Sequence, residues 1–338
     1  MKTYAGIDLH SSNSFVGILD EQDKRLFNKR LPNDLDVILT ALEPFRNSLA
    51  AIVVESTYNW YWLVDGLMDA GYPVHLANPS AIKQYEGLKN VDDKWDSFWL
   101  AHMKRLGILP EGYIYPKEKR PIRDLLRRRM LFVQQRTAQI LSFQTMVSRV
   151  KGLKMSANQI KQLKAEDLGD IFNSEFMILT AREQIETIHF LKNTIRRIEQ
   201  KVKSVMAMEK EFELLLTIPG IGITLGLTIM LEVGDIQRFK EVGNYTSYCR
   251  CVPSQWDSNG KKKGTGNRKN GNTYLAWAYV EAANFNKRYC PLAQRYYQKK
   301  AAKTKNVVAI KALGHKLARA SYYIMRDKVP YESSMLFC

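Results

Sequence analysis

The first third of the chain begins with strand-like patterns and then alternates between strands and helices. Apolar side chains recur at every second position or form short runs in five segments, and they recur every three or four positions in the segments between them. The runs that predict strands are residues 4–10, 14–20, 24–31, 50–56 and 73–79, and those that predict helices are residues 35–45, 59–71 and a segment that starts near 91–93. This order predicts a mixed α/β domain.

The order of these elements favours one kind of sheet over another. Three early strands in a meander, followed by strand–helix alternation, are typical of a ribonuclease H-like sheet. A doubly wound dinucleotide fold would need a glycine-rich turn after its first strand, and the sequence GIDLHS does not supply one.

The middle of the chain has the period of long amphipathic helices. Pro116 and Pro121 predict a linker, and no further proline occurs before Pro219. Gly152 and Gly169 flank the predicted break between two helices. The pair is expected to form either an antiparallel hairpin or a dimerising coiled coil.

The last third contains two segments that suit contact with phosphates. The sequence LLLTIPGIGITLGLTIMLEVGD predicts a helix–hairpin–helix, in which Gly220 and Gly222 let backbone N–H groups approach a phosphate. An ordinary helical hairpin with a glycine turn is the alternative. Residues 253–272 are rich in glycine, lysine and arginine and predict a basic loop before the next helix.

Composition excludes several classes of protein. The hydrophobic content of 45% is ample for folded cores, and no apolar run approaches the ~20 residues that a bilayer span requires. Four cysteines do not form a disulfide framework in a chain of 338 residues, and they lack the spacing of a zinc site. A cytoplasmic protein without a membrane segment is expected.

The net charge of +17 is unevenly distributed. Residues 1–110 hold 11 basic and 14 acidic side chains, whereas the remainder holds 40 basic and 20 acidic ones. A basic excess of this size predicts a polyanionic partner, most plausibly nucleic acid, although a merely soluble basic surface is the alternative. The cluster of Arg123, Arg127, Arg128 and Arg129 is either a solvated basic face or a contact to a phosphate backbone.

Four acidic residues are expected to meet at one edge of the predicted sheet. Asp8 lies in the first strand, Glu55 ends a buried strand, and Asp93 and Asp96 share one face of the helix that follows. Two carboxylates ~4 Å apart repel by about 4 kcal/mol at an effective dielectric constant of ~20. Four together therefore need cations or shifted pKa values, and oxygen ligands suit Mg²⁺ or Mn²⁺.

Each of these acids also has an ordinary interpretation. Any one of them alone suits a helix cap or an exposed surface, and Asp92 and Asp93 are both good cap residues. His10 follows Asp8 by two residues and either touches a phosphate bound at the site or, as is more common, lies on the opposite strand face from the metal.

The pattern of acids resembles the RuvC-like catalytic domain of the DEDD transposases, the Piv/MooV group of insertion-sequence recombinases. The matching motifs are GIDLH with Asp8, VVESTYNW with Glu55, and DDKWDSFWLA with Asp93 and Asp96. Ser97 stands where the family has alanine, and Asp92 makes the register of the aspartate pair ambiguous. The resemblance implies that these four acids hold the metal.

The resemblance extends to the basic loop of the last third. In the family a serine in a glycine-rich basic segment is the nucleophile, and CRCVPSQWDSNGKKKG places Ser258 at that site, six residues before Gly264. Asn259 stands where the family often has glycine, and Ser254 is the alternative nucleophile. The nucleic-acid contacts expected from these segments are Arg123, Arg127, Arg128, Gly220, Gly222, Lys261, Lys262, Lys263, Arg268 and Lys269.

The resemblance implies three regions and a function. The regions are a RuvC-like catalytic domain (1–115), a helical coiled-coil or linker region with a possible role in dimerisation (116–208) and a mostly helical transposase domain (209–338). The implied activity is a transposase or invertase that joins DNA to serine, acts as a homodimer or homotetramer, and is guided by a structured RNA. Two alternatives remain: a metal-dependent nuclease of the Holliday-junction type that uses water, and a nucleic-acid-binding protein without catalysis.

Overall fold

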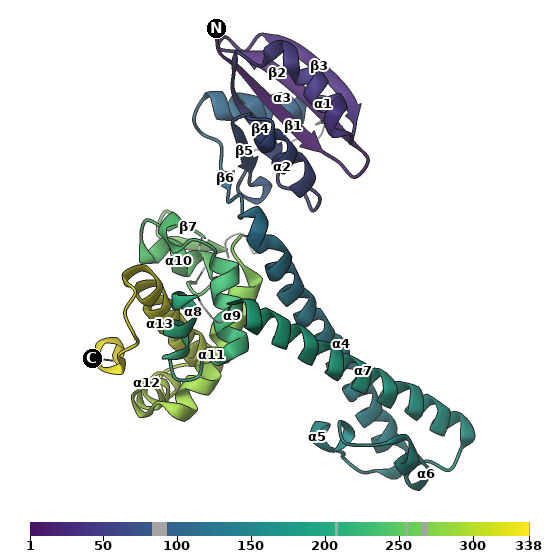
Figure 1. Cartoon of the computed structure of the whole chain (residues 1–338). Coiled ribbons are helices and arrows are strands. Elements are labelled where there is room, and N and C mark those ends of the chain that lie inside the picture. The colour runs from purple at the N-terminus through teal and green to yellow at the C-terminus, as the bar shows by residue number, and fades with distance from the viewer. Residues whose placement is uncertain (83–92, 207–208, 254–255, 265–269, 338) are drawn as a thin grey trace. The chain divides into compact units, whose positions relative to one another are not determined.

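The structure is a computed structural model that describes residues 1–82, 93–206, 209–253, 256–264 and 270–337 (Figure 1). Contacts between Cα atoms divide the chain into two compact units. The first contains residues 1–117 and 254–270, and the second contains residues 118–253 and 271–338. The three regions expected from the sequence stay a prediction.

A six-stranded mixed sheet forms the centre of the first unit, in the order β3-β2-β1-β4-β5-β6. The first three strands pair antiparallel, β1 pairs parallel with β4 and β4 with β5, and β6 is antiparallel to β5. The strands are β1 (Thr3–Leu9), β2 (Asn13–Asp20), β3 (Arg25–Pro32), β4 (Leu49–Glu55), β5 (Val74–Ala77) and β6 (Glu111–Gly112). The five predicted strands and the mixed α/β class are confirmed, and β6 is additional.

Helices cover both faces of this sheet. The core between the sheet and helices α1 (Leu35–Leu42) and α2 (Tyr61–Asp69) includes Ile7 and Val54. The opposite face packs against α3 (Asp93–Arg105), where Val53 joins the cluster that contains residues of α3. Because side chains alternate along a strand, the residues next to Ile7 and Val54 in sequence face α3.

Two glycines allow α3 to approach the sheet closely. A Cβ atom at Gly6 would collide with the carbonyl oxygen of Ser97, and one at Gly17 would lie 2.7 Å from its Oγ. Ser97 is fully buried at this contact. A small residue is therefore required at position 97, and serine meets that need as alanine does. The contact also fixes the start of α3 over β1 and β2.

A long helical hairpin opens the second unit. Helices α4 (Arg120–Lys151) and α7 (Glu175–Met206) lie side by side (Figure 1), and the short helices α5 (Ala157–Ile160) and α6 (Leu168–Ile171) pack at their far end. Gly152 ends α4 with a left-handed φ of 66°. The antiparallel hairpin is thus confirmed, while dimerisation stays a prediction.

The predicted linker at Pro121 is wrong. Pro121 lies in the first turn of α4, directly after a 3-10 turn at Lys117–Lys119. Proline is tolerated there because the first N–H groups of a helix have no partner within it, and its fixed φ suits the helix.

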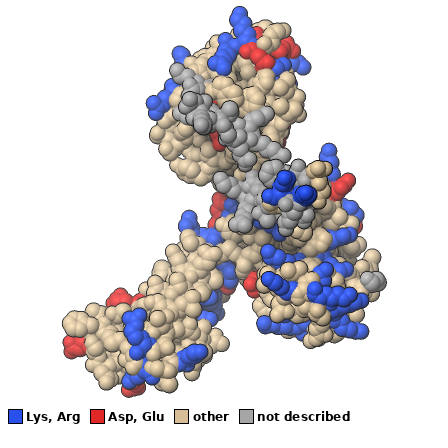
Figure 2. Space-filling model, turned by 180° about the vertical axis from the view of Figure 1, so that it is seen from behind, with Lys and Arg blue, Asp and Glu red and all other residues tan. Residues whose placement is uncertain are grey.

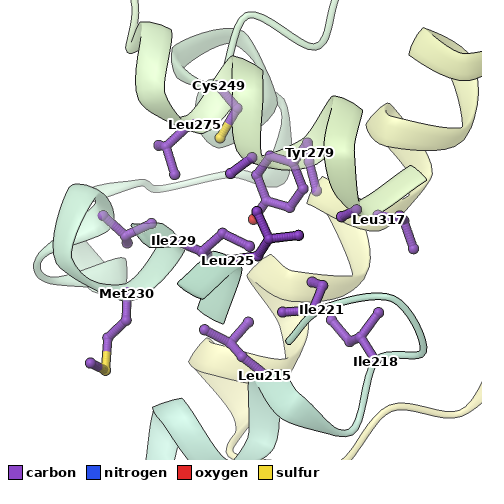
Figure 3. Packing of buried hydrophobic residues seen from close by; sticks show 14 of the residues in the cluster. Leu215, Ile218, Ile221, Leu225, Ile229, Met230, Cys249, Leu275, Tyr279 and Leu317 are labelled. Carbon is purple, nitrogen blue, oxygen red and sulfur yellow. The ribbon is translucent and has the colours of Figure 1, made fainter. Parts of the chain in front are cut away.

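The rest of the second unit is a helical body around one apolar core. Its helices are α8 (Lys210–Leu216), α9 (Ile223–Val233), α10 (Val242–Tyr248), α11 (Thr273–Tyr289), α12 (Pro291–Ala301), α13 (Asn306–Asp327) and α14 (Ser333–Phe337). Figure 3 shows Leu215, Ile221, Leu225 and Tyr279 converging in this core. The pair α8–α9 confirms a helical hairpin at the expected position.

Within the described residues, the helices are too short or too polar to cross a bilayer. The remaining 3-10 turns lie at Glu43–Phe45, Pro79–Ala81, Ala165–Asp167 and Ile236–Arg238.

Candidate catalytic site

Asp8 and Glu55 lie side by side near the carboxyl ends of two parallel strands. Ile7 of β1 is paired with Val54 of β4. Asp8 and Glu55 are the next residues of these two strands, so they lie next to each other across the pair. Both acids project from the face that α3 covers, and Asp8 is only 6% exposed. The strand pairing thus brings two carboxyl groups into one partly buried place, as the sequence predicts.

The raised pKa of Glu55 reflects its burial and the proximity of Asp8. Its pKa is raised from the usual 4.5 to about 8, first by burial, then by the hydrogen bond and negative charge of Asp8, and then by the charge of Asp96. The charge of His10 acts in the opposite direction. Glu55 therefore holds a proton near neutral pH, because ionising it would bury a charge and place it beside the charges of Asp8 and Asp96.

Asp96 reaches this group from α3, and Asp93 begins that helix. Because Gly6 lets α3 lie against β1, the first turn of the helix is held over the strand that carries Asp8. The side chain of Asp93 lies outside the described residues, so its place at the site stays a prediction. Three of the four predicted acids are electrostatically coupled through Glu55.

His10 contacts Asp8 directly, so the expectation that it lies on the opposite strand face is wrong. Its Nε2 is 2.9 Å from Oδ2 of Asp8. Residues two positions apart along a strand point to the same face, so alternation itself places His10 on the side of Asp8, although β1 ends at Leu9. The side chain of His10 is 40% exposed, so the buried Asp8 carboxylate has a hydrogen-bond partner that also contacts solvent.

Two asparagines that the sequence analysis missed fix the backbone at His10. Asn33 and Asn59 donate from Nδ2 to the carbonyl oxygen of His10 at 2.9 and 3.0 Å. Ser14 and Thr57 hold these amides in turn by donating to their Oδ1 atoms at 2.7 and 2.8 Å. Their only sequence signal is their position just after strands β3 and β4.

The donor atoms at this site suit a hard divalent cation. In the part of the chain that is described, no three Asp, Glu, His or Cys side chains are gathered closely enough to hold an ion as they stand. The fit rests on the chemistry of the donors. Burial and the neighbouring carboxyl groups together raise the pKa of Glu55, and a cation would offset both effects.

Ser258 lies in a β-hairpin, so the prediction of a loop over this stretch is wrong. Strands β7 (Trp256–Ser258) and β8 (Lys261–Gly264) are antiparallel, with Ser258 paired to Lys261. Asn259 and Gly260 form the turn with φ values of 53° and 70°, the left-handed pair that Asn-Gly favours in a tight hairpin. Asparagine is among the residues that tolerate the positive φ of this position.

The remaining parts of this segment are only partly described. The hairpin belongs to the first compact unit, the unit of the acids. The side chains of Ser258 and Lys262 lie outside the described residues, as do Ser254, Arg268 and Lys269 entirely. Lys261 and Lys263 are exposed next to the turn.

The two ends of the segment meet at one point of the helical body. The backbone N–H of Asn272 donates to the carbonyl oxygen of Tyr248 at 2.6 Å. Gly271 has a φ of 83°, and a Cβ there would lie 2.7 Å from the same oxygen. The Asn272 side chain caps α11 through its Oδ1. The hydrogen bond between Asn272 and Tyr248 thus joins the two ends of the segment between them, and we call this junction the closed base.

Arg127 has a carboxylate partner inside the protein. Its guanidinium makes two hydrogen bonds to Glu232, at 2.6 and 2.7 Å, and Asn272 Nδ2 donates to the same carboxylate at 2.7 Å. Glu232 is 3% exposed, and its charge raises the pKa of Arg127 against the opposing effect of burial. This pairing accounts for Arg127 without nucleic acid, so its predicted contact with phosphate stays a prediction.

The other predicted nucleic-acid residues of the second unit differ in exposure. Arg128 is exposed, whereas the side chain of Arg123 is only 11% exposed. Gly220 has a φ of 95°, and a Cβ there would lie 2.5 Å from the backbone nitrogen of Asn286 on α11, so packing alone requires glycine. Gly222 is exposed at the start of α9 with no atom near its Cβ position.

Comparison with known proteins places both halves of the chain in one group. Residues 5–151 match the model of the IS110-type DEDD transposases, described as "Transposase", and residues 212–298 match the model described as "Transposase IS116/IS110/IS902 family". Together the two matches cover more than half of the chain.

Curated relatives carry the same kind of name. The chain is 24% identical over 287 residues to the transposase for insertion sequence element IS1111A of Coxiella burnetii, covering 82% of this chain and 76% of the relative. It is 21% identical over 337 residues to the transposase for insertion sequence element IS1328 of Yersinia enterocolitica, covering 95% and 96%. With both family models matched in order, this chain belongs to the IS116/IS110/IS902 family of insertion-sequence transposases.

Proposed function

We propose that this transposase cuts and rejoins DNA through a covalent bond to Ser258, with a divalent cation held by Asp8, Glu55, Asp93 and Asp96. The observation that carries the proposal is the raised pKa of Glu55 beside Asp8 and Asp96. Carboxyl groups gathered at such a cost are typical of a site that binds metal. The sheet order β3-β2-β1-β4-β5 supports a ribonuclease H-like catalytic domain.

In this proposal the four acids act as ligands of the metal ion. Bound Mg²⁺ or Mn²⁺ supplies Lewis-acid polarisation of the phosphate and stabilises the charge that develops on its oxygens. Glu55 must lose its proton to bind, and Asp8 stays oriented by its contact with His10. The asparagine pair at the His10 carbonyl holds that geometry from behind.

Ser258 supplies the attacking atom. Its Oγ forms a bond to phosphorus while the bond from phosphorus to one deoxyribose oxygen breaks. The serine loses one proton and the leaving oxygen gains one, so charge and atoms balance. The phosphoserine link retains the energy of the phosphodiester, and the reverse step rejoins strands without a nucleotide cofactor.

The basic part of the chain supports contacts with both DNA and RNA. Residues 111–338 carry 40 basic and 20 acidic side chains. A structured guide RNA would read the target by base pairing while the protein contacts backbone and shape. Gly222, exposed at the start of α9, and the exposed Lys261 and Lys263 are the best-placed of the predicted contacts in the helix–hairpin–helix and the hairpin.

The proposal is tested by trapping the covalent intermediate. End-labelled donor DNA is incubated with the protein and Mg²⁺, run on a denaturing gel, and the modified peptide is mapped. Wild type is expected to give a protein–DNA adduct on Ser258. Ser258→Ala and Asp8→Asn should each abolish the adduct while DNA binding persists, and Ser254→Ala is the matched control that should retain it.

Other outcomes select other functions. An adduct on Ser254 would move the nucleophile by four residues and keep the mechanism. Equal hydrolytic cleavage by wild type and Ser258→Ala would indicate a metal-dependent nuclease that uses water. If mixtures of Ser258→Ala and Asp8→Asn proteins regain activity, the acids and the serine come from different protomers of a dimer or tetramer.

A further inference from the structure

The helical body carries a long run of basic residues that contains no acid. From Ala282 to Arg326 the sequence has eleven lysines and arginines and neither aspartate nor glutamate. The run covers the second half of α11, all of α12 and all of α13 except its last residue. Figure 2 shows lysine and arginine side chains gathered over this body. None of these residues belongs to the nucleic-acid contacts predicted above.

The run is densest where α12 ends and α13 begins. Lys299, Lys300, Lys303 and Lys305 lie within seven residues, and all four are exposed. We name these four lysines the basic corner. The turn between the helices is ordered by backbone hydrogen bonds, including Lys303 N to Lys300 O at 3.1 Å. In the described parts of the chain, none of the four forms a salt bridge with a carboxylate.

The single acid of α13, Asp327, lies at the opposite end of the helix and pairs with Arg326. Glu211 of α8 pairs with Lys328 just beyond that end. A helix of 22 residues is about 33 Å long, which is several Debye lengths at physiological salt. The four positive charges of the basic corner are therefore not neutralised by their own helix. Like charges held together without counter-charges favour a polyanionic partner.

We infer that the basic corner binds the sugar–phosphate backbone of double-stranded nucleic acid. The residues between its lysines are Ala301, Ala302 and Thr304, which carry no aromatic ring. The neighbouring rings on α12, Tyr296 and Tyr297, are half-buried and already contact Phe337 and Lys287, so they are poorly placed to stack on an unpaired base. Proteins that hold single strands rely on such stacking, whereas contacts to a duplex backbone need only well-placed charges. The inference rests on the proposed function in that it names a surface through which this transposase holds its nucleic acid.

The test measures how binding depends on salt. Fluorescence anisotropy follows binding of a labelled 30-base-pair DNA duplex, the matching RNA duplex and the single strand between ~50 and ~300 mM salt. The variant Lys299→Ala/Lys303→Ala/Lys305→Ala should lower the slope of log affinity against log salt by about 2 to 3 on a duplex, because each lost phosphate contact removes about 0.9. Binding of the single strand should change much less.

A matched control places the same substitutions elsewhere. Lys151, Lys154 and Lys164 are exposed lysines near the far end of the helical hairpin, and their triple alanine variant should keep the wild-type slope. The drop on the DNA duplex, the RNA duplex or both identifies the partner. An unchanged slope on both duplexes, an equal drop in the control, or a larger effect on the single strand would overturn the inference. Circular dichroism verifies that each variant is folded, and Lys303→Glu provides a single change expected to lower the slope by about 1 to 2.

The two proposals fail in different ways. At saturating duplex the triple variant should form the serine adduct at the wild-type rate, because the basic corner contributes binding and not chemistry. If the wild-type protein forms no adduct, the proposed function is wrong, while the salt slopes still decide whether the basic corner binds a duplex.

Discussion

Replacing Glu55 by glutamine should stabilise the metal-free protein at alkaline pH and remove its response to Mg²⁺. Glutamine has almost the shape of a protonated glutamate, and it cannot ionise. In the wild type the raised pKa means that the folded state binds a proton which the unfolded state releases above about pH 4.5. Stability from this group is therefore fully present below pH 4.5 and is lost as the pH rises towards 8.

The size of the effect follows from the shift in pKa. A rise from 4.5 to about 8, at 1.36 kcal/mol per unit, sets an upper bound of about 5 kcal/mol on the stability lost across this range. Glu55 and Asp8 share a hydrogen bond and titrate together, so not all of the shift belongs to Glu55. The expected loss of stability is therefore about 2 to 4 kcal/mol. Glu55→Gln avoids this loss because its amide stays neutral at every pH.

Mg²⁺ should reverse the trend in the wild type. In the proposed site the ion binds the ionised carboxylates, so it would compete with the proton and its stabilising effect would grow with pH. At a concentration 100-fold above its dissociation constant, a ligand that binds only the folded state adds about 2.7 kcal/mol. The wild type should thus gain little from Mg²⁺ at pH 5.5 and most at pH 8.5.

The assay is thermal unfolding of wild type and Glu55→Gln from pH 5 to 9, with 10 mM MgCl₂ or with EDTA. Asp69→Asn is the matched control, since this exposed acid lies on α2 in the same unit. Parallel pH profiles for wild type and Glu55→Gln in EDTA would refute the account of Glu55. A Mg²⁺ shift that survives in Glu55→Gln would show that the ion binds elsewhere.

Substitutions centred on three further positions test the contact of α3 with the sheet, the buried ion pair of the second unit and the turn beside Ser258. Gly6→Ala should force α3 away from Ser97, lowering the unfolding free energy by about 1 to 3 kcal/mol and abolishing the Mg²⁺ shift in the same thermal assay. Glu232→Ala leaves Arg127 without its buried partner and should cost about 2 to 4 kcal/mol in urea unfolding, less when Arg127→Met is added. Asn259→Gly should keep the yield of adduct, whereas Asn259→Val should lower it, because a β-branched residue strains the positive φ of the turn.

The pattern of apolar residues predicts most of the fold because burial follows local periodicity. The alternation around Ile7 and the short run ending at Val54 identify strands whose apolar face packs against α1 and α2. Strand β6 has two residues, Glu111 and Gly112, which are too few to carry a period. Gly6 of the GID motif is required because a Cβ atom there would collide with α3, and this contact is visible only in the structure.

The candidate site is predicted where it depends on strand ends and missed where it depends on distant partners. Asp8 and Glu55 meet because parallel strands align their ends. The contact of Asn59 with the His10 carbonyl joins residues 49 apart, and Arg127 finds Glu232 at a separation of 105. No local pattern encodes such pairs. The dipeptide Asn259-Gly260 is typical of a tight hairpin turn, but the lysines and glycines around it favour a loop.

The closed base at Tyr248 and Asn272 makes the Ser258 segment a tether of fixed length. Ten residues separate Tyr248 from Ser258, and a chain spans at most about 3.5 Å per residue, so the serine stays within about 35 Å of Tyr248 in any conformation. One hydroxyl in a sphere of that radius has an effective concentration of about 10 mM. A phosphate held anywhere inside the sphere meets the Ser258 hydroxyl at this concentration however dilute the protein is.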